Sequence, residues 1–320
     1  MTSGGVSSEL ARGVLSGDRR SLARAITLVE SRRDEDERRA LALLRALLSQ
    51  HRRGMRVGFS GPPGVGKSTL LERIGMLLVR EGRRPALLLV DPSSQRGGGS
   101  ILGDKTRMPE LSREPAAYVR PSPSGEGGGG IAATTGDVLV LCEAAGFGPC
   151  LVETVGVGQA ETAVTSVVDL LCVLLEPGAG DGLQGIKRGL HEWGDVLAVN
   201  KADGSRAKLA ESTRLEYQAA LGLLRGSEQP PVLGVSAAEG TGVAELWRAL
   251  DQRYRAIEAS GELAKRRRAQ LEAELARRLG AGLLRRFLSD AERARELAEL
   301  KDQVASGQLL PREAVRRLLA

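Results

Sequence analysis

Aromatic residues are scarce in this chain of 320 residues, and no long apolar run is present. Phe, Trp and Tyr make up 2% of the sequence, so the core must be built mainly from Leu, Val, Ala and Ile. The chain also offers few rings on which nucleic acid bases could stack. No stretch approaches the ~20 apolar residues of a membrane-spanning helix, and no apolar signal stretch opens the chain. We therefore expect no membrane segment and no nucleic acid partner.

Cysteine and histidine are equally sparse. Cys142, Cys150 and Cys172 are odd in number, lie in or near apolar segments and form no close pair. They are predicted to be buried, reduced thiols of a cytoplasmic protein. The two histidines, His51 and His191, stand alone. Because nickel-inserting maturation GTPases need clustered Cys and His as soft ligands, that class is disfavoured.

The net charge of +6 is unevenly distributed. Basic residues exceed acidic ones in the flanks, residues 1–56 and 262–320, whereas the middle of the chain is mildly acidic. In both flanks Arg is interleaved with Glu, which is typical of solvated helix faces and not of a coherent basic face for nucleic acid.

Residues 61–68 read Gly-Pro-Pro-Gly-Val-Gly-Lys-Ser and are the most informative segment. They follow an apolar run and open a helical stretch, the strand–loop–helix context of a phosphate-binding loop. Glycines let the backbone amides turn toward phosphates, Lys67 can reach the β- and γ-phosphates, and Ser68 can ligate Mg²⁺. The predicted phosphate site consists of Gly61, Pro62, Pro63, Gly64, Val65, Gly66, Lys67, Ser68 and Thr69.

A guanine site is predicted where a later apolar strand, residues 195–199, runs into Asn-Lys-Ala-Asp. The carboxylate of Asp203 can accept from the ring N–H and the exocyclic amine, a donor pair that adenine lacks. Lys201 can lay its stem over the base, and Asn200 can tie this loop to the phosphate loop. A further strand ends in a segment that can offer a backbone amide to guanine O6: Ser236, Ala237 and Ala238. We therefore expect GTP and GDP as ligands, and not ATP.

Acidic residues at strand ends suggest a Mg²⁺ site. Glu153 ends an apolar strand, and Gly156 beyond it can bond the γ-phosphate. Asp91 ends another strand and Asp104 follows a glycine-rich bend; since Mg²⁺ takes few protein carboxylates, one acid can orient water instead. Asp91 can also cap a turn, and Asp104 can be a solvated loop charge. No Gln follows Gly156 directly, so Gln159 is the candidate to position water, and slow intrinsic hydrolysis is expected.

The organisation of the chain indicates an α/β fold with helical additions. Apolar strands alternate with helices over residues 55–260, which predicts a mostly parallel sheet flanked by helices. Strands are expected near residues 55–60, 86–91, 117–120, 150–153, 170–175, 196–200 and 232–236. Residues 1–54 form a predicted helical extension. In residues 261–320, leucines at every fourth position give a long helix an apolar stripe, which can pack on its own domain or form a homodimer interface.

Beyond the nucleotide motifs, long stretches resemble the MeaB/ArgK family of GTPases, P-loop NTPases of the SIMIBI type. The similarity runs from about residue 8 to the C-terminus. The matching stretches are residues 23–31, 90–94, 99–108, 119–123, 141–147, 152–159, 177–181 and 183–187.

This resemblance implies a G-protein chaperone of an adenosylcobalamin-dependent acyl-CoA mutase, usually methylmalonyl-CoA mutase. Such proteins gate cofactor delivery and protect or reactivate the mutase by hydrolysing GTP. The family is homodimeric through a C-terminal helical arm, which favours the homodimer here. It also implies a mobile loop over residues 176–188 that reports the nucleotide state, with Lys187 reaching toward the nucleotide on closure. The residues implied at the phosphate and Mg²⁺ site are Lys67, Ser68, Asp91, Asp104 and Glu153.

Two regions depart from the family pattern: the glycine-rich stretch at 125–130, and Glu176, which puts a charge at the start of the mobile loop. Both leave the identity of the partner open. A kinase or transport ATPase would need adenine selectivity, which Asp203 argues against, and a scaffold that only binds nucleotide is disfavoured by Lys67 and Ser68. No Asp-x-His-x-x-Gly segment is present, so cobalamin is expected to belong to the partner.

Overall fold

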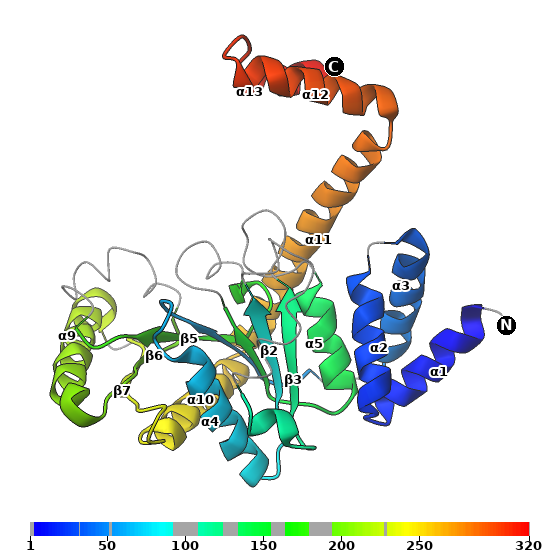
Figure 1. Cartoon of the computed structure of the whole chain (residues 1–320). Coiled ribbons are helices and arrows are strands. Elements are labelled where there is room, and N and C mark those ends of the chain that lie inside the picture. The colour runs from blue at the N-terminus through cyan, green and yellow to red at the C-terminus, as the bar shows by residue number, and fades with distance from the viewer. Residues whose placement is uncertain are drawn as a thin grey trace. The chain divides into compact units, whose positions relative to one another are not determined.

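The computed structural model describes residues 3–31, 33–50, 53–91, 108–123, 134–154, 164–178, 194–226 and 229–319. The chain divides into two compact units, residues 1–264 and 265–320. Figure 1 traces both along the chain, from the blue N-terminal helices to the red C-terminal ones. None of the described helices combines the length and the apolar character needed to span a bilayer.

A seven-stranded sheet forms the centre of the larger unit, and every strand pair in it is parallel. This confirms the predicted α/β fold. All seven predicted strands are found, and their ends differ from the prediction by at most three residues. In chain order the strands are β1 (Arg56–Ser60), β2 (Ala86–Asp91), β3 (Tyr118–Pro123), β4 (Cys150–Glu153), β5 (Leu170–Leu175), β6 (Val196–Val199) and β7 (Val232–Gly234). In space they follow the order β3-β2-β4-β1-β5-β6-β7.

Helices cover both faces of this sheet, as a buried parallel sheet requires. Alternate residues of β2 enter opposite cores: Ala86 and Leu88 one, Leu87 and Leu89 the other. Helices α4 (Lys67–Arg80) and α10 (Val243–Ala259) contribute to the second core, and α5 (Thr135–Ala144) and α9 (Ala207–Arg225) to the first. Two short 3₁₀ turns, Leu111–Arg113 and Gly204–Arg206, complete the described elements of this α/β region.

The N-terminal extension is helical, as predicted: α1 (Ser3–Leu15), α2 (Arg19–Glu30) and α3 (Asp34–Leu48). Asp18 caps α2 by accepting hydrogen bonds from the amides of Arg20 and Ser21, and the hydrogen bonds from Ser21 lower the pKa of Asp18. The buried faces of α2 and α3 join the core shared with α5. The extension is therefore part of the larger unit.

The smaller unit consists of helices. It holds most of α11 (Glu262–Leu288), together with α12 (Ala291–Ala305) and α13 (Pro311–Leu318). Proline is the first residue of α13, a position that its fixed φ and missing N–H suit. Leu300, Leu309 and Ala314 form a small core. The leucines of the predicted stripe on α11 are each more than half exposed: Leu271, Leu275, Leu279 and Leu283.

Candidate nucleotide-binding site

The predicted nucleotide motifs meet at the carboxyl ends of the parallel strands, the edge at which α/β sheets bind ligands. The phosphate loop follows β1, Glu153 ends β4, Asn200 follows β6, and Ser236 follows β7. The strands β4 and β1 are direct neighbours, and Glu153 lies opposite Phe59 in their register. Segments as far apart in sequence as Gly61 and Ser236 are therefore gathered at one edge of the sheet.

The phosphate loop has the backbone that an anion cradle needs. Gly64 and Gly66 have φ values of 76° and 96°, in the left-handed region that glycine adopts without strain. Gly66 is the N-cap residue of α4 and provides no side-chain cap. Because Gly66 has no side chain, the cap does not occupy the first amides of α4. These amides can therefore meet a phosphate at the positive end of the helix.

Lys67 is folded back over this loop. Its Nζ donates to the carbonyl oxygens of Gly61 at 2.8 Å and Pro62 at 3.1 Å, and the residue is 8% exposed. The ammonium group therefore lies against the loop backbone, where it can meet the phosphates that the loop amides would hold.

Ser68 and Glu153, two of the predicted metal ligands, are in contact. The Ser68 hydroxyl donates to both carboxylate oxygens of Glu153, at 2.9 and 3.1 Å. A hydroxyl and a carboxylate are the hard oxygen donors that Mg²⁺ prefers, and this ion takes few protein ligands. Within the described residues no group of three or more His, Cys, Asp and Glu could hold a metal, so a cluster of soft ligands is not found there either.

The base-recognition loops are held by a buried amide. Asn200 is 1% exposed; its Nδ2 donates to the Val65 carbonyl at 2.7 Å, and its Oδ1 accepts from the Ala237 amide at 3.0 Å. Asn200 thus links the phosphate loop to the loop after β7. The Ser236 hydroxyl donates to Asp203, which places this carboxylate next to the same loop.

Two contacts of these loops were missed by sequence reasoning. Arg73, on α4, donates to the carbonyls of Ala237 at 3.2 Å and Ala238 at 2.9 Å. Glu176, noted in the sequence for its charge alone, accepts from Lys201 Nζ at 2.6 Å. No local pattern identifies either partner, because each contact joins segments that only the sheet order brings together.

The remaining predicted residues cannot be placed in this site. Asp104, Gly156, Gln159 and Lys187 lie outside the described residues. Asp91 ends β2 at the same edge of the sheet, and only its backbone is described.

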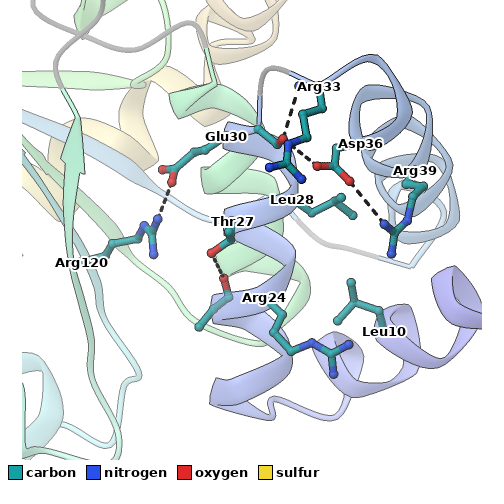
Figure 2. Close-up of a pocket in the computed structure, with 11 residues that line it drawn as sticks. Leu10, Arg24, Thr27, Leu28, Glu30, Arg33, Asp36, Arg39 and Arg120 are labelled. Atoms are coloured by element: carbon teal, nitrogen blue, oxygen red, sulfur yellow. Dashed lines mark hydrogen bonds and ion pairs between the residues drawn. The ribbon is translucent and has the colours of Figure 1, made fainter. Parts of the chain in front are cut away.

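A separate pocket of about 780 Å³ lies among the N-terminal helices (Figure 2) and shares no residue with the nucleotide motifs. Arg120, from β3, pairs with Glu30 of α2. Asp36 of α3 accepts from Arg39 at 3.3 Å and from Ser31 at 2.7 Å. The Glu30–Arg120 ion pair ties α2 to the sheet, and the hydrogen bond from Ser31 to Asp36 ties the end of α2 to the start of α3.

Known proteins are similar to this chain over most of its length. A family model described as methylmalonyl-CoA mutase-associated GTPase MeaB matches residues 22–292. A probable GTPase of Mycobacterium tuberculosis is 45% identical over 313 residues, covering 97% of this chain and 93% of that protein. GTPase ArgK of Escherichia coli is 42% identical, covering 97% and 95%. A mitochondrial methylmalonic aciduria type A homolog of Mus musculus is also 42% identical, covering 96% and 77%.

A solved structure supports the fold assignment. The crystal structure of an LAO/AO transport system kinase aligns with a TM-score of 0.76 and 36% sequence identity, covering 98% of this chain and 96% of that one. The similarity therefore extends over both units of the chain, and not over the phosphate loop alone.

Proposed function

This chain belongs to the MeaB family of methylmalonyl-CoA mutase-associated GTPases, and we propose that it uses GTP hydrolysis to serve an adenosylcobalamin-dependent acyl-CoA mutase. In this proposal the protein gates loading of the cofactor and protects or reactivates the mutase, and the mutase is methylmalonyl-CoA mutase. The observation that carries the nucleotide part is the assembly of Lys67, Ser68 and Glu153 next to a base loop held by Asn200. We place this activity in the cytoplasm, in keeping with three unpaired, buried thiols.

In the proposed site, Lys67 and the first amides of α4 hold the β- and γ-phosphates. Ser68 and Glu153 fit Mg²⁺, directly or through its water, and Asp91 and Asp104 are further candidates for this role. When bound, Mg²⁺ would neutralise charge on the phosphate oxygens. The Asp203 carboxylate accepts hydrogen bonds from the ring N–H and the exocyclic amine of guanine, and Lys201 lies over the base. Gly156 contacts the γ-phosphate, and Gln159 and Lys187 complete the site for hydrolysis.

We also propose that the protein is a homodimer formed through its C-terminal arm. The supporting observation is the exposure of Leu275, at 69%, and of Leu279, at 59%, on α11. An exposed apolar stripe of this length is typical of a helix that packs against a partner. In sedimentation, Leu275→Glu with Leu279→Glu should yield a monomer, whereas Leu223→Glu, at an exposed position of α9, should leave the dimer intact. A double variant that stays dimeric would contradict this assembly.

The function is tested by GTP turnover of the purified protein, alone and with methylmalonyl-CoA mutase from the same organism. We expect slow turnover that rises several-fold with the mutase and falls by about 10³-fold in Lys67→Ala, since it removes a phosphate-binding cation. Lys208→Ala, at an exposed position of α9, is the matched control and should behave as wild type. Turnover that the mutase does not change would leave the GTPase activity in place and would contradict the proposal that this mutase is the partner.

A further inference from the structure

Arg73 lies outside the nucleotide motifs and reaches the loop that follows β7. It sits on α4, the helix whose first residues form the phosphate site, five positions after Ser68. Two different nitrogens of its guanidinium group donate to successive carbonyls, Nε to Ala237 at 3.2 Å and Nη2 to Ala238 at 2.9 Å. A planar fork that binds two acceptors fixes their direction as well as their position.

This contact determines which way the next amide points. In a trans peptide the carbonyl and the following N–H point in opposite directions, so the Ala237 carbonyl held by Arg73 turns the Ala238 N–H away from the arginine. The neighbouring amides are already used: Ala237 N–H donates to Asn200, and Glu239 N–H donates to Ser236. Among the described residues nothing accepts from the Ala238 N–H, which is left available to a ligand oxygen.

A second charged residue outside the motifs, Glu176, contacts the other side of the base loop. Its carboxylate accepts from Lys201 Nζ at 2.6 Å and lies 3.9 Å from a guanidinium nitrogen of Arg206. Lys201 has a left-handed backbone, with a φ of 61°. With its backbone and its ammonium group both fixed, the aliphatic stem between them has little freedom, which suits a stem that must cover an aromatic base.

We infer that Arg73 and Glu176 are positioning residues of the guanine site. Arg73 orients the amide that meets guanine O6, and Glu176 holds Lys201 over the base. Neither residue touches the nucleotide itself. The inference rests on the guanine-binding role proposed above for Asp203 and the loop after β7.

The test compares the affinities of variants for GDP, IDP and pyrophosphate. Removing the Arg73 fork in Arg73→Gln should weaken GDP and IDP alike by about five-fold, because both bases carry O6 and the lost bonds are charge-assisted. Arg73→Lys, which keeps one charged donor, should restore part of the affinity. Arg80→Gln, at an exposed position of the same helix, is the matched control and should bind as wild type.

Glu176→Ala should raise the dissociation rate of GDP and of IDP by about three-fold, because the Lys201 stem is no longer restrained. Glu211→Ala removes a comparable ion pair, with Arg214 on α9, and should leave both rates unchanged. Pyrophosphate binding should not change in any of these variants. A loss of pyrophosphate affinity equal to the loss for GDP would show a general structural effect and overturn the inference.

Asp203→Asn separates this inference from the function on which it rests. It should weaken GDP more than IDP, because inosine lacks the exocyclic amine that the carboxylate reads. If Asp203→Asn changes neither affinity, the proposed guanine site is wrong. If it acts as expected while Arg73→Gln and Glu176→Ala bind like their controls, the positioning roles alone are wrong.

Discussion

Asn200 belongs to the predicted nucleotide site, and its loss should also destabilise the nucleotide-free fold. Its side chain is buried and satisfies two backbone groups, the Val65 carbonyl and the Ala237 amide. Asn200→Ala leaves a buried acceptor and a buried donor unpaired. At about 1–3 kcal/mol for each unsatisfied group, the free energy of unfolding should fall by about 2–6 kcal/mol.

The measurement is urea denaturation of the nucleotide-free protein, followed by fluorescence. For a slope of about 3 kcal/mol per molar, a loss of about 3 kcal/mol lowers the midpoint by about 1 M. Asn200→Asp is the sharper variant, because a carboxylate oxygen would then face the Val65 carbonyl, and two acceptors repel. It should be at least as unstable as Asn200→Ala at pH 7. A midpoint within about 0.2 M of wild type, equivalent to about 0.6 kcal/mol, would refute this reasoning.

Three further predictions concern other sites. Gly66→Ala should weaken GDP binding at least ten-fold, because the new Cβ would lie 2.5 Å from Asn200 Nδ2; Gly82→Ala, with a similar positive φ but open space, is the control for backbone strain. Glu143→Ala should lower the free energy of unfolding by about 3–5 kcal/mol by leaving buried Arg56 unpaired, with GDP affinity of the folded protein unchanged; an unchanged denaturation midpoint would argue against it. Burial raises the pKa of the Cys142 thiol to about 12 and raises the pKa of the other two thiols as well. Native protein at pH 8 should therefore resist a thiol reagent that labels three groups after unfolding, and stability should fall as the pH rises above about 8.5, where only unfolded thiols ionise.

Much of the fold could be predicted because its signals are local. Buried parallel strands appear in the sequence as short apolar runs. Capping residues such as Asp18 lie next to the helix that they begin. The largest difference is at β3, predicted to end at residue 120 and observed to continue to Pro123. Pro121 and Pro123 argue against a central strand, but β3 lies at the edge of the sheet. There a missing N–H leaves no ladder bond unmade on the open side.

The candidate site could be predicted only in part, for the same physical reason. Lys67 and Ser68 belong to one octapeptide, so their proximity follows from the chain itself. An exposed arginine in the middle of a helix, such as Arg73, looks in sequence like any solvated residue. Its role depends on the position of β7 relative to β1, which no local pattern encodes. The same holds for Glu176, whose charge was visible in the sequence and whose partner was not.

The two halves of the nucleotide site therefore differ in what holds them together. The phosphate half is one continuous segment, a loop and the first turn of α4, and its geometry depends on glycine conformation and the helix N-terminus. The base half is assembled from the segments after β6 and β7, and its geometry depends on long-range contacts through Asn200. Changes in the phosphate half should act on phosphate binding and on turnover, because this half supplies the loop amides and Lys67. Changes in the base half should act on affinity and on stability together, since the contacts that orient the base loops also join separate strands of the fold.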